Sequence, residues 1–297
     1  MDAEKKQQKV GLVLEGGSMR GMYTAGVLDT FMDENIKIDG IIGVSAGALF
    51  GPNYFSRQKG RALRYNKRYC KDRRYMSFWN FLTTGNLVSR DFAYYELTTK
   101  HDIFDNETFM KNNTGYYMAA TNVETGKAEY FEVKDILKEM EKLRATSAIP
   151  FVSRIVEVDG KKYLDGGIAD SIPVMKCREL GYDKIIVVLT RPLTYRKKPY
   201  SRQLLRLMAL KYKKYPRFLK AMKRRHNMYN DTVDAIKEME KKGEIFVIRP
   251  SESINVKVVE REAANLQKVY DLGVKDCKKM LDGLRAYLDY HSKKLRI

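Results

Sequence analysis

The pentapeptide Gly43-Val44-Ser45-Ala46-Gly47 sets tight limits on the fold because it lies between two apolar runs. A serine between glycines at a sharp strand-to-helix turn projects its hydroxyl from the end of the strand. The positive end of the following helix would lie near that hydroxyl. The pattern predicts a buried strand, a tight turn and a helix, with Ser45 as a candidate nucleophile. The alternative is a tight turn with a capping serine.

A second glycine-rich segment, residues 16–21, follows an apolar strand expected at 10–14. Its spacing does not fit the GxGxxG dinucleotide fingerprint, and it lacks the Gly-Lys-Ser/Thr of a P-loop. What remains is a nest of backbone N–H groups at a helix start, suited to the oxyanion of a tetrahedral acyl intermediate. The alternative is a structural glycine turn. Its members are Gly16, Gly17, Ser18, Met19, Arg20 and Gly21, with Arg20 expected either to steer charge or to brace the loop.

Asp165, followed by Gly166 and Gly167, is the candidate base. It comes after a predicted hairpin strand, and the two glycines allow the backbone to approach closely around it. An ordinary Asp-Gly turn is the alternative. No histidine has a recognisable triad motif, so we expect surface positions for His101, His226 and His291.

Apolar periodicity predicts strands alternating with helices. Strands are expected at 10–14, 36–42, 116–122, 128–133, 154–158, 161–164, 184–189 and 245–248. Helices are expected at 19–34, 46–58, 134–146, after Pro173 and at 258–290, and the Tyr/Phe-rich stretch up to about residue 105 has no regular pattern. This alternation indicates an α/β fold with a mainly parallel sheet covered on both faces.

The chain is expected to form a single domain over residues 1–297, because it has no internal repeat and no low-complexity linker. Its parts are a catalytic core (about 8–190), a basic helical segment (about 195–240) and a closing strand with helices (about 244–295). No apolar run reaches the roughly 18 residues of a membrane span, and the N-terminal segment has no secretory pattern. The three cysteines are widely spaced, so we expect reduced thiols, no metal site and no cofactor.

The net charge of +19 belongs to two segments. Residues 191–230 hold 14 Lys/Arg and no acidic residue, and residues 57–74 hold nine Lys/Arg against Asp72, which leaves −3 for the rest. Such clustering indicates an anionic partner surface. An anionic membrane is preferred to nucleic acid, since no base-reading motif accompanies the charge. Helices that pack one stripe on the core and leave a solvated basic face are the alternative, with Pro216 kinking or restarting the helix.

The three motifs, in this order, closely resemble those of the patatin-like phospholipases. The segment Ala145-Thr146-Ser147-Ala148-Ile149-Pro150-Phe151 resembles the stretch that precedes the family's aspartate, and residues 120–126 resemble its middle strand and turn. The likeness covers about residues 8–190. It implies a three-layer α/β/α patatin-like fold, here followed by basic C-terminal helices.

The resemblance also implies a Ser–Asp dyad without histidine. Ser45 would be the nucleophile, Asp165 the base, and residues 16–21 the oxyanion hole, with Gly43 and Gly47 shaping the elbow. The family has a third glycine where this chain has Ser18, which costs about 1–3 kcal/mol if that position needs a positive φ. We expect Asp165 to be partly desolvated, and the Ser45 and Asp165 oxygens to lie within about 6 Å.

We therefore expect a serine acyl hydrolase, cytoplasmic or bound peripherally at a membrane surface, that cleaves fatty acyl esters of phospholipids or lysophospholipids through an acyl-serine intermediate. A carboxylesterase or acyltransferase with the same dyad is an alternative. A basic membrane-binding protein that has lost catalysis through Ser18 is another.

Overall fold

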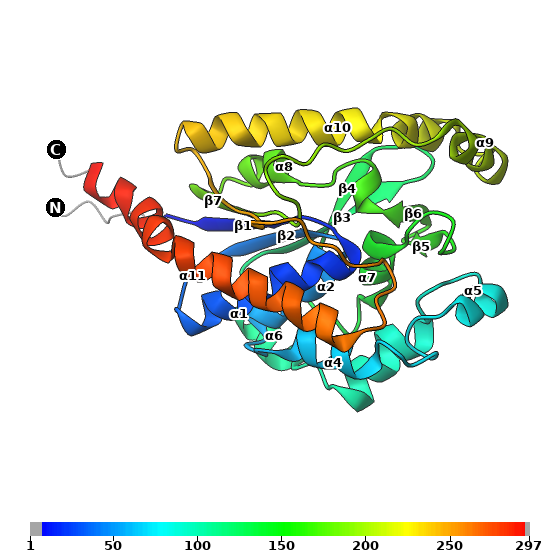
Figure 1. Cartoon of the computed structure of the whole chain (residues 1–297), viewed down its shortest axis with the longest axis horizontal. Helices are drawn as coiled ribbons and strands as arrows, with labels where there is room; N and C mark the ends of the chain where they lie inside the picture. The colour runs from blue at the N-terminus through cyan, green and yellow to red at the C-terminus, as the bar shows by residue number, and fades with distance from the viewer. Residues whose placement is uncertain (1–7, 295–297) are drawn as a thin grey trace.

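The computed structural model describes residues 8–294. Residues 1–7, which bear on the expected absence of a secretory signal, and residue 295, the end of the expected closing helices, lie outside the described residues. In the described part, an eight-stranded sheet has the order β5-β6-β3-β2-β1-β7-β8, and β4 also pairs with β3 (Figure 1). The strands are β1 (Val10–Leu14), β2 (Gly40–Val44), β3 (Tyr116–Asn122), β4 (Ala128–Glu132), β5 (Val156–Val158), β6 (Lys161–Asp165), β7 (Lys184–Val188) and β8 (Phe246–Ile248).

The centre of the sheet is parallel. β1 pairs in parallel with β2 and β7, β2 with β3, and β7 with β8. The antiparallel pairs are β3–β4, β3–β6 and β5–β6, so they are confined to one side of the sheet. The prediction of a mainly parallel α/β sheet is confirmed.

Helices cover both faces of the sheet, which makes three layers (Figure 1). One face carries α1 (Gly21–Asp33), α2 (Ala46–Phe50), α4 (Arg61–Tyr69), α6 (Asn106–Asn112) and α11 (Ala263–Lys294). The other face carries α8 (Val174–Glu179) and α10 (Pro216–Lys241). The remaining helices are α3 (Pro52–Phe55), α5 (Phe78–Thr84), α7 (Met140–Ser147), α9 (Arg202–Lys211), the 3₁₀ turns η1 (Ser18–Arg20) and η3 (Gly166–Ile168), and the π-helical η2 (Asp91–His101).

Alternate residues of each central strand belong to two separate cores. Leu12 and Leu14 of β1 pack with the helices of the α1–α11 face, and Val13 packs toward α8 and α10. All three side chains are fully buried, as expected for a parallel strand covered on both sides.

Two glycines allow α1 and α11 to pack closely. A Cβ on Gly26 would lie 2.3 Å from the carbonyl oxygen of Tyr270, and one on Gly273 would lie 2.1 Å from that of Tyr23. Because both obstacles are backbone atoms, neither position has room for a side chain. This contact holds the long C-terminal helix against the core.

Several expected boundaries are wrong for identifiable reasons. The helix expected at 46–58 is two short ones, because Pro52 lacks an N–H and begins a new helix. The strand expected at 36–42 lies at 40–44, the helix expected at 134–146 at 140–147, and the closing helices are the single α11. The stretch expected to be irregular contains α4, α5 and η2.

Two local predictions are confirmed. Pro216 begins α10. Asp159 and Gly160 turn the β5–β6 hairpin with φ values of 50° and 73°, and a type I′ turn requires positive φ at both positions. No described helix has an apolar stretch long enough to cross a membrane.

Candidate active site

Ser45 occupies a strained turn between β2 and α2. Its φ of 51° and ψ of −121° are unusual for a residue with a Cβ, and such a conformation costs about 1–3 kcal/mol. The glycines on either side make the turn possible. A Cβ on Gly43 would lie 2.5 Å from the Cα of Ala48, and one on Gly47 would lie 2.6 Å from the carbonyl oxygen of Leu14. The turn therefore holds Ser45 at the end of the strand.

The register of β3 brings Asp165 to Ser45. On β3, Ala119 pairs with Val44 of β2, and the next residue, Ala120, pairs with Asp165 of β6. Because β4 pairs with the same part of β3 on its other edge, β2 and β6 meet end to end along one edge. The Ser45 hydroxyl donates a hydrogen bond to Asp165 Oδ2 at 2.6 Å, well inside the expected 6 Å.

The Asp165 carboxylate is buried and accepts a second hydrogen bond. The Gly167 N–H donates to its other oxygen, Oδ1, at 2.8 Å. Burial raises the pKa of Asp165, and the Ser45 hydrogen bond, the charge of Arg225 and the Gly167 N–H partly offset that effect. The expected desolvation is confirmed. Gly166 fits only without a side chain, because a Cβ there would lie 2.1 Å from the Ala119 carbonyl oxygen.

The glycine loop lies against the elbow. A Cβ on Gly16 would be 3.1 Å from the Ser45 Cβ. In the described part of the chain, the N–H groups of Gly17 and Ser18 have no hydrogen-bond acceptor. Ser18 has a φ of 51°, so the position that carries glycine in the resembling family does need a positive φ, and the Ser18 hydroxyl donates to the Val258 carbonyl at 3.0 Å.

The rest of the loop turns into the protein. Ser18–Arg20 form η1, and the Met19 side chain is buried in the core. Gly21 begins α1, and a Cβ there would lie 2.7 Å from the Phe50 ring. Arg20 does not brace the loop within the described structure: its Nε is buried without a hydrogen-bond partner, and its side chain lines a cavity beside Ser45.

Ser45 lies between two cavities of different character. The first, about 120 Å³, is mainly apolar and includes Leu49, Tyr65, Tyr75, Tyr94, Leu97 and Phe104 among its lining residues. The second, about 300 Å³, contains Asp165, the glycine loop and several cationic side chains. Of the aromatic residues between 75 and 95, Tyr75 and Tyr94 line this first cavity, whereas Phe78 and Trp79 are exposed to solvent.

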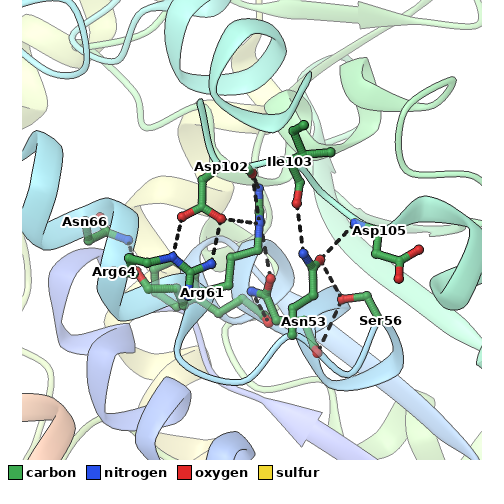
Figure 2. A network of polar contacts seen from close by, with 11 residues as sticks. Asn53, Ser56, Arg61, Arg64, Asn66, Asp102, Ile103 and Asp105 are labelled. Atoms are coloured by element: carbon green, nitrogen blue, oxygen red, sulfur yellow. Dashed lines mark hydrogen bonds and ion pairs between the residues drawn. The ribbon is translucent and has the colours of Figure 1, made fainter. Parts of the chain in front are cut away.

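A partly buried polar network reaches the wall of the apolar cavity through Arg61. Figure 2 shows its contacts. Arg61, which lines the cavity, donates to the Asp102 carbonyl oxygen at 2.6 Å and to Asn53 Oδ1 at 3.2 Å. Arg64 binds both oxygens of the Asp102 carboxylate at 2.8 Å. The network ties α4 to the end of η2, so part of the basic segment 57–74 is internal structure rather than a partner surface.

Thr146 is a site residue that motif analysis did not single out. Its Oγ1 accepts the Ser45 N–H at 3.1 Å, and its hydroxyl donates to the Ala119 carbonyl. Thr146 therefore joins the elbow to β3. The sequence signal for Thr146 is its position in the segment 145–151, which resembles the stretch that precedes the aspartate in the patatin-like phospholipases. His101 and His226 line neither cavity beside Ser45.

The described residues contain no group of three or more His, Cys, Asp and Glu side chains placed to hold a metal ion. The three cysteines are buried and free. A hydroxyl, a carboxylate and backbone amides lie together at Ser45, beside the cationic side chains of the second cavity. These are sufficient for nucleophilic attack on an ester with proton transfer and oxyanion stabilisation.

Two family models match this chain. The family model described as patatin-like phospholipase matches residues 12–177, and a domain of unknown function (DUF6363) matches residues 215–289. The uncharacterized protein YjjU of Escherichia coli is 33% identical over 189 residues, which cover 62% of this chain and 52% of YjjU. Lysophospholipase NTE1 of Saccharomyces cerevisiae is 26% identical over 186 residues, which cover 61% of this chain and 11% of that protein.

A crystal structure of VipD from Legionella pneumophila aligns with 93% of this chain and 67% of VipD, at a TM-score of 0.45 and 10% identity. The matched region is about half the length of YjjU and a small part of the yeast protein. The patatin-like model, by contrast, matches more than half of this chain, including Ser45, Asp165 and the glycine loop. The chain therefore belongs to the patatin-like phospholipase family, and its three-layer α/β/α architecture is consistent with that family.

Proposed function

We propose that this protein is a serine acyl hydrolase that cleaves fatty acyl esters of phospholipids or lysophospholipids. The observation that carries the proposal is the 2.6 Å hydrogen bond from Ser45 to Asp165 at the junction of an apolar and a cation-lined cavity. Relatives named lysophospholipase, such as nte1 of Aspergillus oryzae, which is 27% identical over 186 residues, also support the proposal.

In the proposed mechanism, Ser45 Oγ attacks the ester carbonyl carbon and its proton passes to Asp165 Oδ2. The resulting oxyanion accepts hydrogen bonds from the Gly17 and Ser18 N–H groups. One strong donor of this kind lowers the activation free energy by about 3–4 kcal/mol. The alcohol leaves with the proton from Asp165, and an acyl-Ser45 ester remains. Water then gives a proton to Asp165 and attacks the acyl carbonyl carbon. The bond between that carbon and Ser45 Oγ breaks, Asp165 returns the proton to Ser45 Oγ, and the fatty acid leaves.

Asp165 is suited to this role because its pKa is raised. A carboxylate with an ordinary pKa accepts a serine proton poorly at neutral pH. Burial makes the Asp165 carboxylate a stronger base and so a better acceptor for the serine proton. Its hydrogen bonds to Ser45 and Gly167 fix its orientation toward the serine. The Ser45 backbone is held independently through Thr146.

The apolar cavity supports a fatty acyl substrate rather than a short ester. Its lining comes from α2, α4, η2 and α7, and the π-helical η2 contributes Tyr94 and Leu97. π-Helical turns are rare and often occur at functional sites. An acyl chain that enters from Ser45 would replace water against these side chains, with about 0.8 kcal/mol for each buried methylene.

The test is release of fatty acid from lysophosphatidylcholine, together with labelling by a fluorophosphonate probe. Ser45→Ala should lose labelling and turnover, and Asp165→Asn should lower kcat about 10³-fold or more while the chain stays folded. Asp170→Asn is the matched control, because Asp170 is a neighbouring carboxyl with a pKa also raised by burial, but it lines neither cavity. Full activity in Asp165→Asn would remove the dyad assignment.

We further propose that the protein works at an anionic membrane surface. Among the described residues, the 14 cations of segment 191–230 form one ion pair, between Arg196 and Asp234. The apolar stripe of α9 and α10 packs inward through Met208, Phe218 and Met222, as the packing alternative expects. The basic face is nevertheless left unpaired beside exposed leucines.

Exposed apolar side chains gather on α5 and α9, which both project at the right-hand end of the molecule in Figure 1. They include Trp79 on α5 and Leu210 on α9, which are 65% and 73% exposed. Apolar side chains beside basic ones are typical of helices that lie in a membrane interface. Each cation near an anionic surface contributes on the order of 1 kcal/mol.

Vesicle sedimentation tests this surface. Binding should be stronger to vesicles containing phosphatidylglycerol than to pure phosphatidylcholine, and should weaken with salt. Leu210→Ser and Trp79→Ser should reduce it. Met175→Ser is the matched control, an exposed apolar residue on α8. Equal binding to both kinds of vesicle would remove the electrostatic argument.

A further inference from the structure

The second cavity at Ser45 is lined by four cations from separate parts of the chain. They are Arg20 of η1, Arg191 after β7, Lys197 in the following loop and Arg225 of α10. Two carboxylates, Glu15 and Asp165, line the same cavity. An excess of buried or half-buried positive charge at one cavity is unfavourable unless an anion occupies it.

Both carboxylates are already engaged by neutral donors. Glu15 accepts the Tyr229 hydroxyl at 2.8 Å and the Thr190 N–H at 2.6 Å. Asp165 accepts Ser45 and the Gly167 N–H. None of the ion pairs in the described part of the chain includes any of the four cations.

Two of the cations, Arg225 and Lys197, are held in place by other contacts. Arg225 donates to the Gly167 carbonyl at 2.6 Å and to the Tyr200 hydroxyl at 2.7 Å. The Lys197 ammonium lies 4.4 Å from the centre of the Tyr229 ring. These contacts fix the position of the charges without neutralising them.

Two of the cations show the cost of this arrangement. Burial, and then the charge of Arg225, lowers the pKa of Lys197 to about 7. Burial and the charge of Arg191 lower the pKa of Arg20, whose buried Nε has no hydrogen-bond partner in the described structure. A bound anion would oppose both shifts.

We propose that this cavity is a phosphate subsite that holds the headgroup phosphate of a phospholipid or lysophospholipid while its ester lies at Ser45. This inference rests on the proposed hydrolase function. Arg20, Arg191 and Lys197 supply the binding charge, and Arg225 adds charge while holding the loop of Asp165. The subsite makes phosphate-bearing esters preferred over neutral glycerides with the same acyl chain.

The chemistry of glycerophospholipids suits two cavities that meet at one serine. The scissile ester and the phosphate are on the same glycerol unit, and the acyl chain leaves the ester in the opposite direction. Ser45 lines both cavities, so an acyl chain on the apolar side puts the glycerol phosphate on the cationic side. Charge-assisted hydrogen bonds from Arg and Lys are strong ligands for phosphate.

The first experiment compares two substrates in neutral detergent micelles, zwitterionic 1-palmitoyl lysophosphatidylcholine and 1-palmitoylglycerol. The readout is the ratio of their kcat/KM values, which cancels effects common to both esters. Lys197→Gln and Arg191→Gln should each lower this ratio at least about tenfold. Lys198→Gln, an exposed neighbour that lines neither cavity at Ser45, should leave it within about twofold.

The second experiment does not depend on turnover. Glycerol 3-phosphate and inorganic phosphate, at constant ionic strength, should raise the Tm of the wild type and of Ser45→Ala by mass action. Lys197→Gln should abolish the shift. The neutral micelles and the soluble ligands keep membrane charge out of both measurements.

The outcomes separate the possible failures. If phosphate raises the Tm of the wild type but Lys197→Gln and Arg191→Gln leave the substrate ratio unchanged, the cavity holds free phosphate. That result overturns the headgroup assignment. No shift and no change in the ratio would overturn the subsite itself. If the wild type cleaves neither ester but the shift occurs and depends on Lys197, the hydrolase proposal fails and the phosphate site stands.

Discussion

The backbone strain at Ser45 can be measured by comparing two inactive variants, Ser45→Gly and Ser45→Ala. Both remove the hydroxyl and with it the hydrogen bond to Asp165, so that loss cancels in the comparison. They differ in the Cβ, which makes the observed φ of 51° and ψ of −121° costly. Glycine adopts such a conformation without steric penalty.

The strain at such a residue is about 1–3 kcal/mol. Against it, glycine gives the unfolded chain more freedom, which costs about 0.5–1 kcal/mol relative to alanine. The difference leaves Ser45→Gly more stable than Ser45→Ala by about 1 kcal/mol, or about 1–2 °C in Tm for a chain of this size. This reverses the usual order of the two residues.

Urea unfolding of both variants measures this difference. Ala221→Gly is the matched control, because Ala221 lies within the regular helix α10, where the same exchange should cost about 1 kcal/mol. If Ser45→Gly is less stable than Ser45→Ala by as much as the control, the elbow is not strained and the reasoning is refuted.

Three further predictions concern the core, the polar network and the site. Gly26→Ala should destabilise by about 1–3 kcal/mol because its Cβ meets backbone, whereas Gly283→Ala, with nothing nearer than 3.5 Å, should stabilise slightly in urea unfolding. Asp102→Ala removes the carboxylate partner of the buried Arg61 and should lower the free energy of unfolding by about 3 kcal/mol. Asp33→Ala, which breaks an exposed ion pair, should lower it by less than about 1 kcal/mol. Since burial raises the pKa of Asp165, kcat/KM should fall as the pH decreases through a value above 3.8; an acid limb at or below 3.8 would contradict it. The folded chain binds the Asp165 proton more tightly than the unfolded chain does. The contribution of Asp165 to the free energy of unfolding therefore decreases as the pH rises from about 3.8 through its raised pKa.

The sequence predicts the elbow and the hairpin well because both depend on local chemistry. Glycines at 43 and 47 are required by neighbouring backbone within the same strand–turn–helix unit, and Asp159-Gly160 specifies its own turn. The alternation of strands and helices likewise predicts the layers. These features need no knowledge of the rest of the chain.

The cavities could not be predicted in this way. Residues 61–101 form helices whose aromatic side chains are divided between core, cavity and solvent, so their pattern has no single period. The π-helical turn of η2 has no sequence signal of its own. The charge of segment 191–230 was plain, but composition does not tell which cations turn inward; Arg191, Lys197 and Arg225 do.

The central contact of the site depends on strand register. Ser45 and Asp165 meet because consecutive residues of β3, Ala119 and Ala120, pair with Val44 and Asp165. A slip of two residues between β6 and β3 keeps every side chain on its face but moves Asp165 by about 7 Å, out of reach of Ser45. The burial of the strand side chains therefore does not exclude that slip. Gly166 opposes it, since its backbone lies too close to the Ala119 carbonyl for any side chain, and this fit exists in the observed register. The glycine after the aspartate therefore fixes where the carboxylate lies, and the burial around that carboxylate sets its basicity.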